Sequence, residues 1–242
     1  MKNSEIETLR TWIAESERVV FFGGAGVSTE SGIPDFRSED GLYHQKFDYP
    51  PETILSHSFF YQHTAEFYRF YREKMLLPDG IQPNAAHKKL AELEQAGKLT
   101  AVVTQNIDGL HQMAGSRRVY ELHGSIHRNY CTKCRRFYPM AFIRDSEGLP
   151  RCTCGGLIKP DVVLYEESLD GACIEGAVEA ISEADILIVG GTSLTVYPAA
   201  GLIRYYRGNR LVLINRDETQ YDSYADLVFR DPIGKILGAI EV

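Results

Sequence analysis

A glycine-rich turn directly after an apolar run constrains the fold of this chain more than any other feature. Residues 19–22 read Val-Val-Phe-Phe and predict a buried strand, and Gly-Ala-Gly follows at residues 24–26. In α/β proteins, a strand that feeds such a turn brings backbone N–H groups against the phosphates of a dinucleotide. The chain continues into Gly-Ile-Pro-Asp-Phe-Arg at residues 32–37, which adds a ring, a carboxylate and a guanidinium. The stretch therefore predicts a loop that can hold a cofactor and act on it.

Further apolar runs alternate with helical patterns along the chain. Strands are predicted at residues 100–104, 185–189, 211–214 and 227–229, and helices at residues 5–17, 58–76 and 84–96. Asn84 is expected to cap the last of these helices and Gly97 to end it. Unbroken β-branched strands between helices indicate a parallel sheet covered on both faces. We therefore predict an α/β fold, a Rossmann-like parallel sheet domain, and 242 residues leave room for one small insertion.

Polar residues follow several of the predicted strands. Because ligands of open α/β sheets bind at the carboxyl ends of strands, these side chains should converge on one site. They are Gln105, Asn106, Asp108, Thr192, Ser193 and Asn215. In the glycine turn itself, Thr29 stands where the usual dinucleotide fingerprint has a third glycine. A turn of this kind fits a purely structural role equally well, so the converging polar ends are what favour a cofactor site.

Four of the five cysteines form two close pairs, Cys131-x-x-Cys134 and Cys152-x-Cys154. Four thiolates at this spacing predict a closed tetrahedral zinc site, which holds structure and leaves no position for a substrate. The alternative is a set of unrelated reduced thiols. Residues 124–160, which lack long periodic segments, are interpreted as a small zinc-binding insertion domain. Cys173 lies outside it, in a predicted helix, and is expected to be an inert packed residue.

Among the seven histidines, His123 is the candidate general base, because it precedes a glycine and the start of the zinc insertion. The glycine permits close approach of a ligand, and an imidazole with a pKa near ~6.5 can accept a proton at neutral pH. A hydrogen-bonded core histidine is the alternative interpretation. The other six are expected to be structural (His111, His127) or surface and capping residues (His44, His57, His63, His87).

The charge balance is acidic, with 26 Lys and Arg against 33 Asp and Glu and a net charge of −7. A nucleic-acid-binding protein needs a basic footprint, so this class is disfavoured. The amino-terminal segment is polar and amphipathic, and no apolar run approaches the length that spans a bilayer. We expect a cytoplasmic, monomeric protein with no nucleic-acid or membrane partner.

Four motifs together resemble the sirtuin family in its bacterial type, and the resemblance extends over about residues 10–235. They are Gly-Ala-Gly-Val-Ser (24–28), Gly-Ile-Pro-Asp-Phe-Arg (32–37), Thr-Gln-Asn-Ile-Asp-Gly-Leu-His (104–111) and Glu-Leu-His-Gly (121–124). The resemblance implies an NAD-dependent protein-lysine deacetylase or deacylase, a transferase that passes the acyl group to ADP-ribose and releases nicotinamide. It also implies a Rossmann-like part at about residues 1–123 and 161–242. The small zinc domain would span about residues 124–160, with part of residues 40–80 as a further helical or loop insertion.

The resemblance assigns individual residues as well. It makes His123 the catalytic base. The zinc ligands would be Cys131, Cys134, Cys152 and Cys154. The residues expected to contact NAD are Ala25, Thr29, Phe36, Arg37, Gln105, Asn106, Ile107, Asp108, Thr192, Ser193, Asn215 and Asp231. Asp108 would hold the nicotinamide amide, Phe36 would shield the ribose carbon, and Asn106 would orient the ribose or a water. An acylated lysine of a substrate protein would lie beside Val163, Tyr165, Tyr68 and Tyr71.

Two departures from the family pattern bear on the substrate. Glu166 replaces the glycine of the Phe-Gly-Glu triplet common in the substrate loop, and the extra acid could favour basic residues in the peptide. Relatives that remove succinyl or malonyl groups carry a Tyr-x-x-Arg pair, whereas here Tyr68 is followed by Tyr71, with Arg72 one step later. One helical step turns a side chain by about 100°, so Arg72 is expected to miss the pocket and a neutral acyl group, acetyl first, is favoured.

Two other functions use the same features. In a mono-ADP-ribosyltransferase, another nucleophile would attack the same ribose carbon of NAD. A non-enzymatic NAD-sensing zinc module would bind NAD without turnover. A hydride-transferring dehydrogenase is poorly supported, because no acidic ribose-binding residue follows on a second strand.

Overall fold

The sheet that carries the glycine turn has six parallel strands. The structure is a computed structural model and describes residues 3–35 and 49–241. The strands are β1 (Val19–Gly23), β2 (Leu99–Thr104), β3 (Val119–Glu121), β7 (Ile186–Gly190), β8 (Leu211–Ile214) and β9 (Leu227–Phe229). Their order is β3-β2-β1-β7-β8-β9, and every neighbouring pair is parallel. The chain therefore winds outward from β1 in both directions, which makes the β1–β7 junction the topological switch point.

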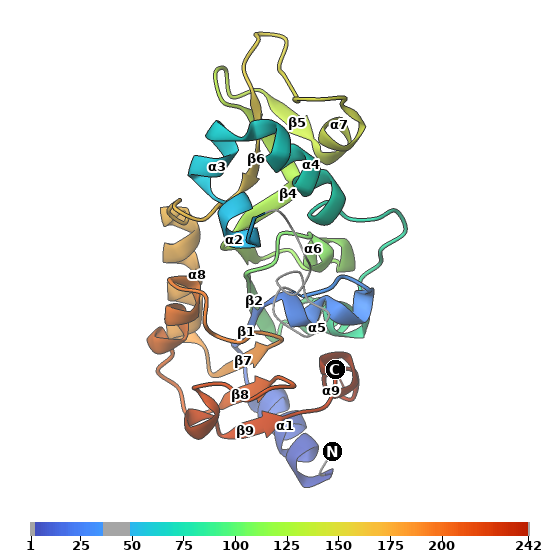
Figure 1. The fold of residues 1–242 in the computed structure, drawn as a ribbon. Helices are drawn as coiled ribbons and strands as arrows, with labels where there is room; N and C mark the ends of the chain where they lie inside the picture. The colour runs from blue at the N-terminus through green and yellow to red at the C-terminus, as the bar shows by residue number, and fades with distance from the viewer. Residues whose placement is uncertain (1–2, 36–48, 242) are drawn as a thin grey trace.

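Helices cover both faces of this sheet, as Figure 1 shows. On one face lie α1 (Asn3–Glu15), α5 (Ala85–Gln95) and α9 (Ile233–Gly238), whose apolar residues share a core with Phe21. On the other face lie α8 (Gly171–Glu183) and the 3₁₀ helix η4 (Ala199–Tyr205), which pack with Val20 and Phe22. Successive strand residues point to opposite faces, so one apolar run supplies both cores. The predicted α/β class is confirmed.

A second, smaller group of elements lies beyond the carboxyl ends of these strands (Figure 1). Its antiparallel sheet joins β5 (Phe137–Pro139), β4 (Gly124–Cys131) and β6 (Ile158–Val162) in that order. Around it lie α2 (Pro51–Ile54), α3 (His57–Gln62), α4 (Thr64–Lys74) and α7 (Met140–Asp145). One core cluster unites the α2–α4 segment with β4 and β6, although they are far apart in sequence. We call these elements the small module; the exact domain boundaries stay an interpretation.

Several local details differ from the sequence prediction. The single helix expected at residues 58–76 is two helices, α3 and α4, because His63 between them has a non-helical backbone (φ −130°, ψ 49°). The strand β3 was not predicted, since it has three half-buried residues and no apolar run. At α5 the prediction is confirmed, because Asn84 caps the helix and Gly97 follows it with φ +74°.

Further short elements complete the chain. They are the 3₁₀ helices η1 (Ala25–Val27), η2 (Thr29–Ser31) and η5 (Asp222–Tyr224), and α6 (Leu110–Ala114). Within residues 3–35 and 49–241, the helices are all too short or too polar to cross a membrane.

Candidate active site

The glycine turn after β1 packs directly against the turn after β7. The N–H of Gly24 donates to the Gly190 carbonyl at 3.2 Å, and that of Gly26 donates to the Gly191 carbonyl at 2.8 Å. A Cβ at position 26 would lie 2.8 Å from the Gly191 Cα, and one at position 24 would lie 2.8 Å from the Thr192 Cβ. The two turns can meet at the switch point only because these positions lack side chains. This brings Thr192 beside the glycine turn.

Asp108 lies at the centre of a buried hydrogen-bond network at the same edge of the sheet. Its Oδ2 accepts from the Ser28 hydroxyl at 2.6 Å, and its Oδ1 accepts from the Leu110 N–H at 2.9 Å. The Asn106 amide donates to the Ser28 hydroxyl oxygen at 3.1 Å. Ser28, Asn106 and Asp108 are all buried. The network fixes the Asp108 carboxylate and the Asn106 amide at Ser28, which follows the glycine turn.

The orientation of His123 determines which ring nitrogen can accept a proton. Its Nδ1 lies 2.9 Å from the backbone oxygen of Gln105. Because a carbonyl oxygen only accepts, Nδ1 carries the hydrogen, and Nε2 of the neutral ring has a free lone pair. Burial lowers the pKa of His123 below 6.5, against the opposing effect of the bond to Gln105. The residue is therefore a neutral base at physiological pH.

The backbone segment that contains His123, between β3 and β4, is fixed by contacts with β6 and the residues that follow it. The His123 carbonyl accepts from the Val163 N–H at 3.0 Å. Arg128 forms ion pairs with Glu121 at 2.6 Å and with Asp161 at 2.8 Å, which join β3 to the small module. The His127 Nε2 donates to the Asp108 carbonyl at 2.8 Å, a contact that agrees with the structural role predicted for this residue.

The other polar strand ends are only partly brought together. Gln105 donates to the Thr192 hydroxyl at 3.2 Å, which links the ends of β2 and β7. Ser193 is exposed and pairs with Thr195, and the Asn215 amide donates to the Asp217 carbonyl at 2.8 Å.

The remaining residues proposed to contact NAD have different surroundings. Ala25 belongs to η1, and the Thr29 hydroxyl donates to the Gly26 carbonyl at 2.9 Å. Ile107 packs against the small module, and Asp231 pairs with Lys235 at 2.7 Å. Phe36 and Arg37 lie outside the described residues. Contact of these residues with NAD stays a prediction.

The two tyrosines proposed to contact the acyl group lie inside the small module. Tyr68 and Tyr71 have no exposed surface, and the Tyr68 hydroxyl donates to the Ile158 carbonyl. Within the described residues, the Tyr71 hydroxyl has no hydrogen-bond partner. Arg72 donates to the carbonyls of Ile143 at 2.9 Å and Gly148 at 2.7 Å, and to the Ser146 hydroxyl. Its guanidinium thus joins α4 to α7 and the residues that follow α7, within the small module.

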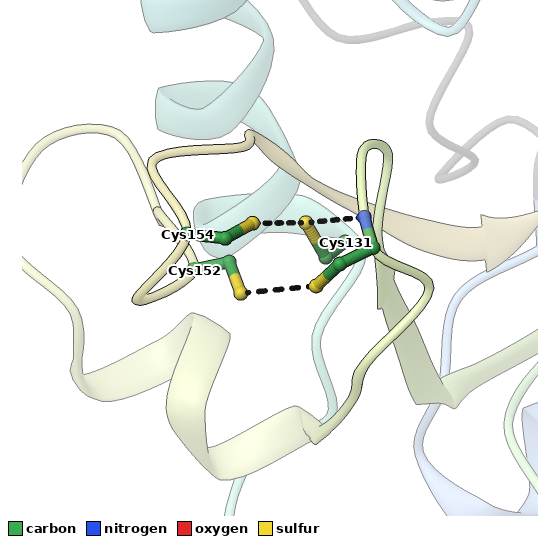
Figure 2. A group of neighbouring side chains, drawn as sticks. Cys131, Cys152 and Cys154 are labelled. Atoms are coloured by element: carbon green, nitrogen blue, oxygen red, sulfur yellow. Dashed lines mark hydrogen bonds between the residues drawn. The ribbon is translucent and has the colours of Figure 1, made fainter.

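The four paired cysteines form one cluster. Their sulfur atoms all lie within 4.8 Å of one another. The Cys131 sulfur is 3.5 Å from that of Cys154, and the Cys134 sulfur is 3.5 Å from that of Cys152. Figure 2 shows the sulfurs of Cys131, Cys152 and Cys154 directed toward one another. A Zn–S bond of ~2.3 Å places the corners of a sulfur tetrahedron about 3.8 Å apart, so the cluster fits zinc.

The backbone around the cluster also suits thiolate ligands. The N–H groups of Lys133 and Cys134 point at the Cys131 sulfur at 3.4 Å. A Cβ at Gly156 would lie 2.6 Å from that sulfur, so a glycine is required there. The cluster holds β4 to the loop before β6, as expected of a structural site. Cys173 lies apart on α8, half-buried, and burial raises the pKa of its thiol.

Comparison with known proteins identifies the family. The sequence profile of the Sir2 family matches residues 24–198. A Clostridium acetobutylicum protein named NAD-dependent protein deacetylase is 62% identical over 240 residues, 98% of each chain. One of the same name from Clostridium perfringens is 60% identical, over 98% of this chain and 99% of that one. This chain belongs to the Sir2 family. The resemblance to sirtuins inferred from the motifs is confirmed.

Solved sirtuin structures share the fold as well. A Sir2 structure described as containing a p53 peptide and NAD⁺ has a TM-score of 0.84 at 39% identity, covering 96% of this chain and 95% of that one. A Sir2 variant with a deacetylated p53 peptide and 3′-O-acetyl ADP-ribose has a TM-score of 0.88 at 38% identity, covering 96% of both. Both likenesses extend over the sheet and the small module of this sirtuin.

Proposed function

We propose that this sirtuin is an NAD-dependent protein-lysine deacetylase that passes the acetyl group to ADP-ribose and releases nicotinamide. The observation that carries the proposal is His123, a half-buried neutral imidazole whose Nδ1 is hydrogen-bonded to the Gln105 carbonyl. His123 follows β3, and Asp108 follows the neighbouring parallel strand β2. The names of the relatives and the ligands of the solved Sir2 structures support the same activity.

The residues at the switch point fit NAD. Gly24 and Gly26 let the turn after β1 pack against the turn after β7, at the switch point where open α/β sheets bind dinucleotides. The Asp108 carboxylate is a buried acceptor suited to a carboxamide N–H. NAD⁺, when bound, supplies a ribose carbon that carries a positively charged nicotinamide leaving group.

In the mechanism, this chain positions groups and moves one proton. Asp108, oriented by Ser28 and the Leu110 N–H, holds the carboxamide, and Asn106 orients the ribose or a water. His123 Nε2 accepts a proton from a ribose hydroxyl, which activates that oxygen toward the transferred acyl group. The peptide lies along residues 163–167, which are joined to His123 through the Val163 N–H.

A neutral acyl group is favoured by the contacts of Arg72. Its guanidinium is bound to three acceptors of the small module and is not offered to an acyl carboxylate. We propose acetyl as the preferred group; contact of Tyr68 and Tyr71 with it stays a prediction, and neither side chain has exposed surface. The monomeric state and cytoplasmic location stay predictions, which light scattering and cell fractionation would test.

The decisive experiment follows nicotinamide release from NAD⁺ with acetyl-, succinyl- and longer-acyl-lysine peptides, and with no peptide. Release that requires an acyl peptide, fastest with acetyl, is the expected result. Release accompanied by transfer of labelled ADP-ribose to protein would favour a mono-ADP-ribosyltransferase. No consumption of NAD⁺ would favour a binding module.

A further inference from the structure

Glu166 adopts a backbone conformation that is common for glycine and uncommon for residues with a side chain. Its φ is +75°, in the left-handed region that few residues other than glycine, Asn and Asp adopt. The substrate loop of sirtuins commonly has a glycine here, which takes this φ without a steric penalty. The loop of this chain therefore keeps the glycine conformation in spite of the Glu166 side chain, and some contact must stabilise it.

That contact is with Ser58, the second residue of α3. The Ser58 N–H donates to Oε2 of Glu166 at 2.9 Å, and the Ser58 hydroxyl donates to the same oxygen at 2.6 Å. These hydrogen bonds hold the pKa of the Glu166 carboxyl below its usual range, although the residue is exposed. The Glu166 carboxylate therefore takes part in an intramolecular contact at the protein surface.

Neighbouring contacts fasten the same segment to the start of α3. The Tyr165 carbonyl accepts from the His57 N–H, and the Tyr165 N–H donates to the Leu55 carbonyl, both at 2.9 Å. The His57 ring donates to Glu167 at 2.8 Å. At the other end, the Val163 N–H is bonded to the His123 carbonyl. Residues 163–167 thus form a strap between the proposed base and α3.

We propose that Glu166 is a positioning residue: through Ser58 it locks this strap against α3 in the orientation that receives the acyl-lysine peptide. This inference rests on the proposed deacetylase function. It differs from an attraction of basic peptide residues to the extra acid, because the carboxylate is already occupied by Ser58. A fixed strap lowers the entropy lost on binding, so the benefit falls on peptide affinity.

The test compares the peptide KM, the NAD⁺ KM and kcat across five variants. Glu166→Gly restores the family residue but removes the contact, and should raise the peptide KM about three- to tenfold with kcat and the NAD⁺ KM unchanged. Glu166→Gln keeps an oxygen acceptor for Ser58 and should stay near the parent protein. Ser58→Ala should raise the peptide KM, and the double variant should be no worse than Glu166→Gly. Glu52→Gln, which removes an exposed carboxylate from α2, is the charge control.

An unchanged peptide KM in Glu166→Gly, or fully additive effects of Glu166→Gly and Ser58→Ala, would overturn the proposal. So would a KM increase confined to peptides with Lys or Arg beside the acyl-lysine, because that outcome indicates charge attraction. Amide hydrogen exchange of residues 163–167 tests the strap independently of enzyme activity. The exchange should be faster in Glu166→Gly than in the parent protein. Equal exchange rates would contradict the lock. An inactive parent protein would instead contradict the proposed function.

Discussion

The Ser28 hydroxyl donates a hydrogen bond of 2.6 Å to the Asp108 carboxylate, across 80 residues of sequence. The bond connects Ser28, which follows the glycine turn after β1, to Asp108, which follows β2. Since Asn106 also bonds to Ser28, the hydroxyl fixes two polar side chains at once. The direction of the Asp108 side chain is therefore set before any ligand binds.

Replacing Asp108 by Asn should test this arrangement. The amide keeps the size of the carboxylate and an oxygen for the Leu110 N–H, so the fold should persist. The substitution removes the negative charge and directs N–H groups toward the nicotinamide amide. We therefore expect kcat/KM for NAD⁺ to fall about 10- to 100-fold. Steady-state kinetics at saturating acetyl peptide measures this. An Asp108→Asn protein with unaltered kcat/KM would remove Asp108 from the site.

The pH dependence of activity follows from the state of His123. The protonated ring cannot accept a proton, and burial lowers the pKa of His123 below 6.5. Activity should therefore persist at pH 6.5 and decline only as the pH falls further. The acid limb of kcat/KM for the free enzyme reports this pKa. A limb centred above pH 6.5 would contradict the environment described for His123.

Acid stability should depend on His111, which is buried in contact with the His87 ring. Neither of its ring nitrogens has a hydrogen-bond partner within the described residues, and burial lowers the pKa of His111 to about 3. The unfolded chain takes up this proton near pH 6.5, so the free energy of unfolding falls as the pH drops below that value. The loss from this group between pH 7 and pH 5 is about 2 kcal/mol.

His111→Phe keeps a ring of similar size and removes the titrating group. Its free energy of unfolding should fall less than that of the parent protein between pH 7 and pH 5. Urea unfolding at both pH values measures the difference. Equal losses in the two proteins would show that His111 titrates normally in the folded state.

The cysteine cluster gives a prediction about metal content. Gly156→Ala would place a Cβ 2.6 Å from the Cys131 sulfur and 2.8 Å from the Lys133 Cβ. It should lower zinc content and the thermal midpoint, because the metal holds the small module together. Gly171→Ala, at the first residue of α8 with open space around it, is the matched control and should retain zinc. Zinc content by elemental analysis checks both, and full occupancy in Gly156→Ala would contradict the cluster geometry.

Features encoded by local spacing could be predicted from the sequence. The strand β1, its glycine turn and the cysteine pairs each lie within a few residues, so composition and periodicity reveal them. The polar residues after β2 were predictable for the same reason, because parallel strands place their ends at one edge.

Features that depend on distant residues could not be predicted. The Ser28–Asp108 bond spans 80 residues and the Ser58–Glu166 bond spans 108, and no local pattern encodes either. The burial of Tyr68 and Tyr71 depends on how α4 packs against β4 and β6, which are distant in sequence. The break between α3 and α4 at His63 could not be predicted either, because the aromatic sequence around it is compatible with one continuous helix.

The most direct test of the account is single-turnover nicotinamide release and deacetylation by His123→Ala, with the exposed His63→Ala as the control. Loss of the base should lower the rate of deacetylation about 10²- to 10⁴-fold while NAD⁺ affinity stays nearly constant. His63→Ala should resemble the parent protein. Deacetylation by His123→Ala at the parent rate would contradict the central claim that this imidazole accepts the proton.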